Sequence, residues 1–264
     1  MVFAMSEARE GVKIDRIEFT FNIPEGIPEF ETVEDATAYF GRSVSNGIKS
    51  WRFSIKLADD VVCYFSNRRG NARIAPGKLV IGSASSNKIP ISNIASRVHS
   101  YLPSWINLRR ICRIDIASDV FIPFDEFCIK IAPLGMDKSF CYAHYVGTHG
   151  RSFKDHTQTF QVGKKETVLR LYNKQAEQGV DFAWSRAEFQ FRGKIIRYTG
   201  NVPTDSSCLE TVLQLVGHGL QFFRPCSRYY ETNPNESIVS PYWLGLFSAI
   251  ADPVKLRRNT VYYV

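Results

Sequence analysis

The sequence lacks the features that define several common protein classes. Its six cysteines form no C-x-x-C pair and have no regular spacing, so neither a disulfide framework nor a cysteine zinc site is expected. No apolar run approaches the roughly 20 residues of a membrane span. Residues 1–11 contain no apolar signal-peptide core. We therefore expect a cytoplasmic protein without a membrane partner.

Internal repeats and low-complexity segments are also missing. His144, His149 and His156 lie close together, but their spacing matches no common zinc pattern, which favours surface or packing roles. Most cysteines are flanked by apolar residues, as in Ile111-Cys112 and Phe127-Cys128. We expect them to pack as small hydrophobic side chains in a reducing compartment.

The composition is that of a folded, basic protein. The chain has 264 residues, of which 44% are hydrophobic, enough to bury a core without disulfides. Lys and Arg number 33 against 26 Asp and Glu, a formal net charge of +7, which indicates a polyanionic partner. Residues 105–264 hold 20 basic and 15 acidic residues, against 13 and 11 before them. An anion site is expected in this second part.

Hydrophobic periodicity predicts an α+β fold with a mainly antiparallel sheet, one catalytic face, and helices packed on the other face. We divide the chain into an N-terminal α+β part (1–104), a central part (105–200) and a C-terminal helical part (201–264). Strands are predicted at 12–22, 51–57, 61–66, 78–83, 109–121, 140–146, 158–162, 167–173 and 182–192. Helices are predicted at 90–102, 124–131, 206–220 and 242–250.

Three of these strands share one pattern of side chains. Alternate residues of a strand point to opposite faces of a sheet. In ICRIDIASD, Arg113, Asp115 and Asp119 therefore oppose the isoleucines, and in VLRLYNK the residues Arg170, Tyr172 and Lys174 oppose the leucines. In SRAEFQFR the polar face consists of Arg186, Glu188, Gln190 and Arg192. If the strands are neighbours, one face is apolar and the other carries ionisable groups.

Two interpretations of the polar face stay open. It is either a solvated face with cross-strand ion pairs or a reactive site. Asp115, Asp119 and Glu188 form a hard-oxygen cluster suited to Mg²⁺ or Mn²⁺, and their mutual repulsion would require a cation. Beside a metal, the Tyr172 oxygen could attack a phosphodiester. Because a free phenol has a pKa near 10, the phenolate would need adjacent cations such as Lys174.

These residues also carry a family resemblance. The succession RIDIASD (113–119), LRLYNK followed by Glu177 (169–174), and RAEFQFR (186–192) resembles the replication initiators of rolling-circle plasmids, which are similar to filamentous-phage initiators and to some relaxases. Upstream, TFQVG (159–163) fits the strand that precedes the tyrosine motif. The resemblance covers roughly residues 105–200, with weaker similarity near residues 13–21 and 241–256.

The resemblance implies a metal-dependent enzyme that nicks one strand of a double-stranded origin and stays joined to the 5′ phosphate through tyrosine. Residues 105–200 would then be the nicking core. By motif, Tyr172 is the nucleophile, Asp115, Asp119 and Glu188 hold Mg²⁺ or Mn²⁺, and Lys174, Arg113 and Arg170 assist. The implied partners are double-stranded origin DNA, single-stranded DNA, a host helicase and a second copy of the chain. A relaxase and a non-catalytic DNA-binding regulator remain alternatives.

The sequence departs from the family pattern at two points. The histidine-x-histidine triplet of the other large class of rolling-circle nickases is missing, and Gln161 stands where many relatives carry an aromatic residue. Rival nucleophiles are Tyr198, Tyr229, Tyr230, Tyr262 and Tyr263. We prefer Tyr172 because it lies between basic residues on the strand face that carries the carboxylates.

Basic residues near aromatic ones are candidates for DNA contacts, because such a composition suits phosphate binding and base stacking. Packed aromatics beside ordinary surface cations would give the same pattern. A recognition role for the C-terminal part would centre on Arg224, Arg228, Lys255, Arg257 and Arg258, with residues 1–104 as a further DNA contact. The candidate residues are Arg186, Arg192, Lys194, Arg197, Arg224, Arg228, Arg257 and Arg258.

Overall fold

The structure is a computed structural model that forms two compact units. Unit 1 comprises Met1–Val12, Ile116–Phe191 and Val212–Val264, and unit 2 comprises Lys13–Asp115 and Arg192–Thr211. Both units are assembled from separate segments of the chain. The structure describes residues 9–23, 26–47, 51–66, 76–83, 91–104, 106–135, 150–154, 157–197, 204–228 and 238–247.

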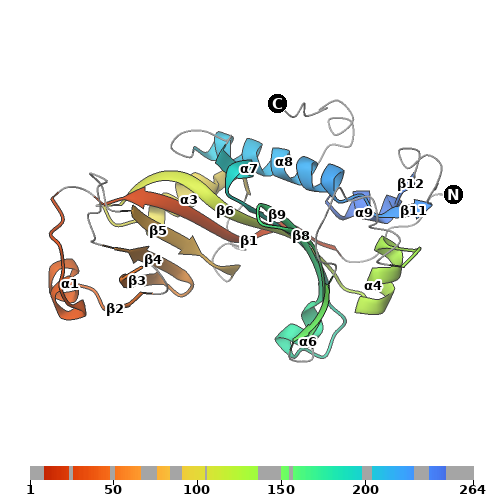
Figure 1. The fold of residues 1–264 in the computed structure, drawn as a ribbon, viewed down its shortest axis with the longest axis horizontal. Coiled ribbons are helices and arrows are strands. Elements are labelled where there is room, and N and C mark those ends of the chain that lie inside the picture. The colour runs from red at the N-terminus through yellow and green to blue at the C-terminus, as the bar shows by residue number, and fades with distance from the viewer. Residues whose placement is uncertain are drawn as a thin grey trace. The chain divides into compact units, whose positions relative to one another are not determined.

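Unit 2 is built on a sheet with the strand order β2-β3-β4-β5-β1-β6 (Figure 1). These strands are β1 (Arg9–Asn22), β2 (Val44–Asn46), β3 (Phe53–Ala58), β4 (Val61–Phe65), β5 (Pro76–Ile81) and β6 (Asn107–Val120). The pairs β2–β3, β3–β4, β4–β5 and β1–β5 are antiparallel. The predicted meander over residues 51–83 is therefore confirmed.

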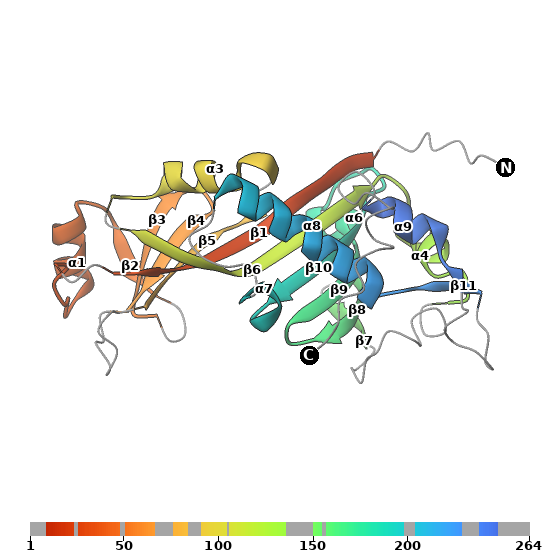
Figure 2. The ribbon, with the colours of Figure 1, turned by 90° about the horizontal axis from the view of Figure 1, so that it is seen from above.

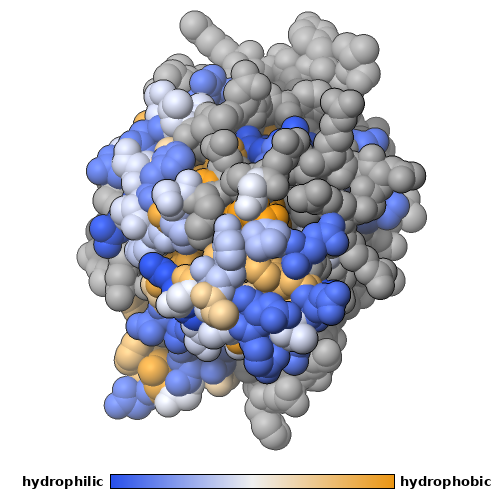
Figure 3. Space-filling view, turned by 90° about the vertical axis from the view of Figure 1, so that its left-hand side faces the viewer, coloured by the Kyte–Doolittle hydropathy of each residue, from blue (hydrophilic) through white to orange (hydrophobic). Residues whose placement is uncertain are grey.

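The alternation in β1 creates the core of unit 2. Ile17, Phe19 and Phe21 are buried, whereas Arg16 and Thr20 on the other face are partly exposed. The short helices of this unit are α1 (Val33–Phe40), the 3-10 turn η1 (Ile91–Asn93), α3 (Ile94–Tyr101) and α7 (Lys194–Arg197). The space-filling view in Figure 3 shows mostly hydrophilic residues, with apolar ones between them, over the coloured surface.

Unit 1 has the strand order β6-β10-β9-β8-β7. The strands are β7 (Gly150–Lys154), β8 (Thr157–Lys164), β9 (Thr167–Asn173) and β10 (Ser185–Arg192), and the pairs β7–β8, β8–β9 and β9–β10 are antiparallel. Gly163, which ends the TFQVG segment, has φ +99°, and a Cβ there would lie 2.4 Å from the Thr167 carbonyl oxygen. This position therefore requires glycine.

Helices cover the apolar face of the unit 1 sheet. They are α4 (Phe124–Ile131), α8 (Asp205–Phe222, of which unit 1 holds the part from Val212) and α9 (Pro241–Leu246). Phe189 of β10 stacks on Phe247 with ring centroids 4.6 Å apart, and Gly219 of α8 lies so close that a Cβ there would be 2.9 Å from the Phe189 ring. Figure 2 shows α8 running over β10. The predicted packing of helices on the apolar face is confirmed.

The remaining differences from the sequence-based prediction are local. A five-residue helix, α6 (Lys174–Gln178), connects β9 and β10 where a loop was expected, and the strands β2, β7, β11 (Cys226–Arg228) and β12 (Ile238–Val239) were not predicted. The strand predicted at 140–146 lies outside the described residues, as does the end of the helix predicted at 242–250. None of the described helices is long and apolar enough to cross a membrane.

The α+β fold with a mainly antiparallel sheet is confirmed. Among the described cysteines, Cys63 and Cys208 are buried free thiols, as expected, whereas Cys112 and Cys128 are partly exposed. Burial raises the pKa of Cys208 to about 12, and the charge of Asp205 adds to this effect.

Candidate active site

The predicted nucleophile lies on the polar face of unit 1. Tyr172 of β9 stands opposite Arg186 of β10, and Arg170 stands opposite Glu188, so these four side chains share one face. The Tyr172 hydroxyl donates a hydrogen bond to Glu188 Oε2 over 3.0 Å. Tyr172 is only 5% exposed and Glu188 only 2%. Tyr172, Glu188 and Arg186 are therefore buried rather than solvated, whereas Arg170 is partly exposed and forms a cross-strand ion pair with Glu188, as the alternative interpretation expects.

Glu188 is held by further donors. Its Oε1 accepts a hydrogen bond from Gln190 Nε2 over 2.6 Å and lies 3.6 Å from Arg170 Nη1. Gln190 is two residues along the same strand, so both side chains project from one face of β10. The carboxylate is thus fixed with one oxygen toward the phenol and the other toward an amide and a guanidinium.

Arg186 connects the phenol to a second carboxylate. Its Nε and Nη2 donate to Asp119 Oδ1 and Oδ2 over 2.5 and 2.9 Å, and its Nη1 donates to the Tyr172 hydroxyl oxygen over 3.5 Å. Arg186 is 1% exposed and Asp119 is fully buried. This bidentate pairing fixes the guanidinium plane beside the phenol oxygen.

Two further cations lie against the Tyr172 ring. The Arg170 guanidinium carbon is 5.4 Å from the ring centroid and Lys174 Nζ is 5.7 Å from it. Lys174 also forms an ion pair with Glu177, the acidic residue that follows the tyrosine motif. The structure thus gathers Tyr172, Lys174, Arg170, Asp119 and Glu188 in one group.

Arg113 and Asp115 belong to unit 2. There Asp115 accepts a hydrogen bond from Arg113 Nε over 2.8 Å, and the same arginine lies 3.7 Å from the buried Glu18. Lys78 and Arg16 also pair with Glu18, at 2.5 and 2.7 Å. Burial raises the pKa of Glu18, but the hydrogen bond and charge of Lys78, helped by the two arginines, outweigh burial and lower the pKa below its usual value.

The predicted metal site does not fit the described residues. They contain no group of three or more His, Cys, Asp or Glu side chains that could hold a metal ion. Asp119 has both oxygens bound by Arg186, Asp115 is bound by Arg113, and Glu188 is bound by protein donors. Arginine guanidinium groups thus lie against the carboxylates whose charges were expected to require a divalent cation.

The predicted DNA contacts differ in exposure. Arg192, Lys194, Arg224 and Arg228 are exposed. Arg186 is buried beside Tyr172, so it belongs to the candidate active site rather than to an outer surface. Outside the described residues lie Lys255, Arg257, Arg258, the Arg197 side chain, the histidines His144, His149 and His156, and the rival tyrosines Tyr198, Tyr229, Tyr230, Tyr262 and Tyr263.

Three contributors are not predicted from the sequence. Gln190 lies two residues from Glu188, a spacing that indicates a shared face but not the hydrogen bond between the two side chains. Trp184 carries no signal of its own in the sequence, yet the Arg186 guanidinium carbon lies 5.8 Å from its ring centroid. Glu18 alternates with Ile17 and Phe19 in a predicted strand, but nothing in that pattern indicates its cationic partners.

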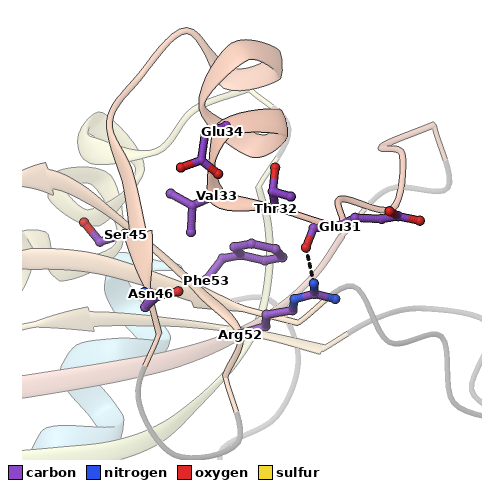
Figure 4. Close-up of a pocket in the computed structure, with 8 residues that line it drawn as sticks. All are labelled: Glu31, Thr32, Val33, Glu34, Ser45, Asn46, Arg52 and Phe53. Atoms are coloured by element: carbon purple, nitrogen blue, oxygen red, sulfur yellow. Dashed lines mark hydrogen bonds between the residues drawn. The ribbon is translucent and has the colours of Figure 1, made fainter.

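Unit 2 also contains a surface pocket of about 530 Å³ (Figure 4). It is lined by the start of α1, by β2 and by the start of β3, and Arg52 donates a hydrogen bond to the Glu31 carbonyl oxygen. The pocket includes none of the predicted site residues. It therefore does not correspond to the predicted catalytic face.

The fold is shared with a protein of known structure. No family model matches the chain, and no curated protein matches its sequence. Among solved structures, the chain is similar to a rolling circle replication initiator protein from Geobacillus stearothermophilus, with a TM-score of 0.57 and 14% identity over 92% of this chain and 97% of the other. The chain therefore shares its fold with a rolling circle replication initiator, as the resemblance of its motifs implied.

Proposed function

We propose that this chain is a replication initiator that nicks one strand of a double-stranded origin through Tyr172 and so starts rolling-circle replication of a plasmid or phage. The observation that carries the proposal is the position of the phenol oxygen, 3.0 Å from Glu188 Oε2 and 3.5 Å from Arg186 Nη1. A base and a cation thus flank one hydroxyl. The fold shared with a rolling-circle initiator supports the same proposal.

The reaction begins at the Tyr172 hydroxyl. Glu188 Oε2 accepts the phenolic proton while the phenol oxygen attacks phosphorus. The new bond joins phosphorus to the tyrosine oxygen, and the bond between phosphorus and the 3′ oxygen breaks. The 3′ oxygen takes up a proton from water and leaves as a hydroxyl that primes synthesis, the proton on Glu188 passes to water, and the 5′ phosphate remains on Tyr172. The reverse sequence reseals the strand.

The cations have separate roles in this scheme. Arg186 stabilises the developing negative charge on the phenol oxygen, and Asp119 is a positioning residue that holds Arg186. Lys174 and Arg170 lie against the Tyr172 ring, where they stabilise the phenolate. Arg113 belongs to unit 2. We assign it to phosphate binding, together with the cations that lie near it in that unit. The scheme assigns no role to a metal ion, because the described carboxylates do not form a metal-binding group in this arrangement.

The proposed partners are double-stranded origin DNA, single-stranded DNA after nicking, a host helicase and a second copy of the chain. Arg192, Lys194, Arg224 and Arg228 are exposed, and we assign them to contacts with the DNA backbone because cationic side chains bind phosphates. Charge reversal of Arg224 and Arg228 is expected to weaken origin binding while nicking of a single-stranded oligonucleotide continues. Equal loss of both activities would contradict a recognition role.

A second candidate function is a non-catalytic DNA-binding regulator that keeps the fold. The burial of Tyr172 favours it, because a side chain 5% exposed meets a phosphodiester only if neighbouring side chains shift. A relaxase is a variant of the first proposal, since its chemistry at the tyrosine would be the same.

The test is incubation of the protein with supercoiled origin DNA, followed by denaturation and electrophoresis. We expect open-circular DNA and a covalent protein–DNA adduct from the wild type and from Tyr198→Phe, and neither product from Tyr172→Phe. An adduct formed equally by Tyr172→Phe would reject the assigned nucleophile. A wild type that binds origin DNA without nicking it would favour the regulator.

A further inference from the structure

Three aromatic residues gather at one end of the unit 1 sheet without being buried. Phe121 follows β6 directly, and Phe182 and Trp184 precede β10. Phe182 stacks on Trp184 with ring centroids 5.8 Å apart and planes 18° apart, and Phe121 lies 5.9 Å from Phe182 and 6.2 Å from Trp184. Phe182 is 47% exposed and Phe121 is 38% exposed. We call these three residues the aromatic platform.

The platform is unusual in its position. Large apolar side chains are stabilised by burial, so several exposed rings in contact with one another often mark a binding surface. Other exposed apolar residues of unit 1, such as Ile129, Leu213 and Leu244, come from separate helices. Within the described part of unit 1, the exposed aromatic rings of the platform contact one another, whereas these other exposed apolar residues are scattered.

The platform adjoins the candidate active site through two cations. Lys174 Nζ is 5.9 Å from the Trp184 ring centroid and 5.7 Å from that of Tyr172. The Arg186 guanidinium carbon is 5.8 Å from the Trp184 ring centroid, and its Nη1 is 3.5 Å from the Tyr172 hydroxyl oxygen. A main-chain hydrogen bond from Gln175 N to the Trp184 carbonyl oxygen, 2.9 Å long, fixes α6 against this end of β10.

From this arrangement we propose that the aromatic platform binds an unpaired base of single-stranded DNA, next to the phosphate that Tyr172 attacks. The inference rests on the proposed function. Unstacked bases bind to exposed aromatic rings, and such stacking tolerates any base because every base has a π-face. The exposed ring of Phe182 supplies the stacking surface, and Lys174 and Arg186, which lie beside both Trp184 and Tyr172, connect that surface to the reacting tyrosine. The platform therefore positions the strand for attack.

The test measures binding, independently of nicking, with a fluorescein-labelled single-stranded dT 12-mer and full-length protein. Base–aromatic stacking is worth about 1–3 kcal/mol, so Phe182→Ala is expected to raise Kd about 5- to 150-fold. Phe182→Tyr keeps the ring and is expected to bind like the wild type, whereas Phe182→Leu is expected to bind weakly. Ile129→Ala, at a residue that is 67% exposed on α4, is the matched control and should leave Kd unchanged.

An abasic 12-mer of the same charge separates stacking from phosphate binding. It should bind the wild type more weakly than dT does, and Phe182→Ala should no longer distinguish the two oligonucleotides. Equal binding of both by the wild type, or an unchanged Kd in Phe182→Ala, would overturn the platform. If Phe182→Ala changes the sedimentation coefficient of the DNA-free protein, the platform is a contact between two copies of the chain. That result would also overturn the proposal of a base-binding platform. If the wild type forms no covalent adduct with origin DNA, the proposed nicking function is rejected. The Kd values for the oligonucleotides would still test whether the platform binds a base.

Discussion

Replacing Arg186 by methionine is expected to destabilise unit 1 strongly. The guanidinium is the bidentate partner of Asp119, and the two side chains are 2% and 0% exposed. Removing one member of a buried ion pair leaves a desolvated charge and costs about 3–5 kcal/mol. Asp119→Leu alone is expected to cost a similar amount, because it leaves Arg186 charged and buried.

The double variant Asp119→Leu with Arg186→Met is the informative one. It removes both charges together, and apolar replacement of a buried pair is often neutral or stabilising. We expect it to recover most of the free energy of unfolding lost by either single variant, which gives a coupling energy of several kcal/mol. The pair itself then contributes less net stability than either single substitution suggests.

The assay is urea denaturation followed by circular dichroism, with Glu126→Gln as a control. Glu126 pairs with Lys130 on the surface of α4 at 3.3 Å, and such partly exposed pairs contribute about 0–1 kcal/mol. A loss below about 1 kcal/mol for Arg186→Met, or a double variant that loses the sum of both single effects, would refute the burial of this pair.

Further predictions concern catalysis, metal and pH. Glu188→Gln keeps the shape of the side chain but not its basicity, so adduct formation is expected to slow by roughly 10²- to 10⁴-fold; a normal rate would remove Glu188 as the base. Because arginines compensate the described carboxylates, EDTA is expected to leave Tm unchanged, and a clear drop measured by differential scanning fluorimetry would restore a structural metal. The lowered pKa of Glu18 means that its stabilising contribution is present above its ordinary pKa of 4.5 and is lost as pH falls through the lowered value. Glu18→Gln should therefore reduce the acid-induced fall in Tm, and an unaltered pH profile would contradict this reasoning.

Period-two alternation predicted much of the fold, because one buried face dictates which residues of a strand are apolar. Leu169 and Leu171 of β9, with Phe189 of β10, are fully buried as that pattern requires. Alternation does not report what covers the other face. The burial of Tyr172 and Asp119 was consequently not predictable from local sequence.

The partners of the site carboxylates depend on tertiary structure. Asp115 and Asp119 lie four residues apart on β6, yet Asp115 belongs to unit 2 with Arg113 and Asp119 belongs to unit 1 with Arg186. Sequence spacing indicated a shared face and therefore a metal cluster. It could not show that each carboxylate has its own arginine.

The covalent bond between Tyr172 and DNA can be located by mass spectrometry of the adduct after protease and nuclease digestion. We expect a nucleoside 5′-phosphate on the peptide that contains Tyr172. A nucleotide on any other tyrosine, or a nicked origin without a modified peptide, would contradict this assignment.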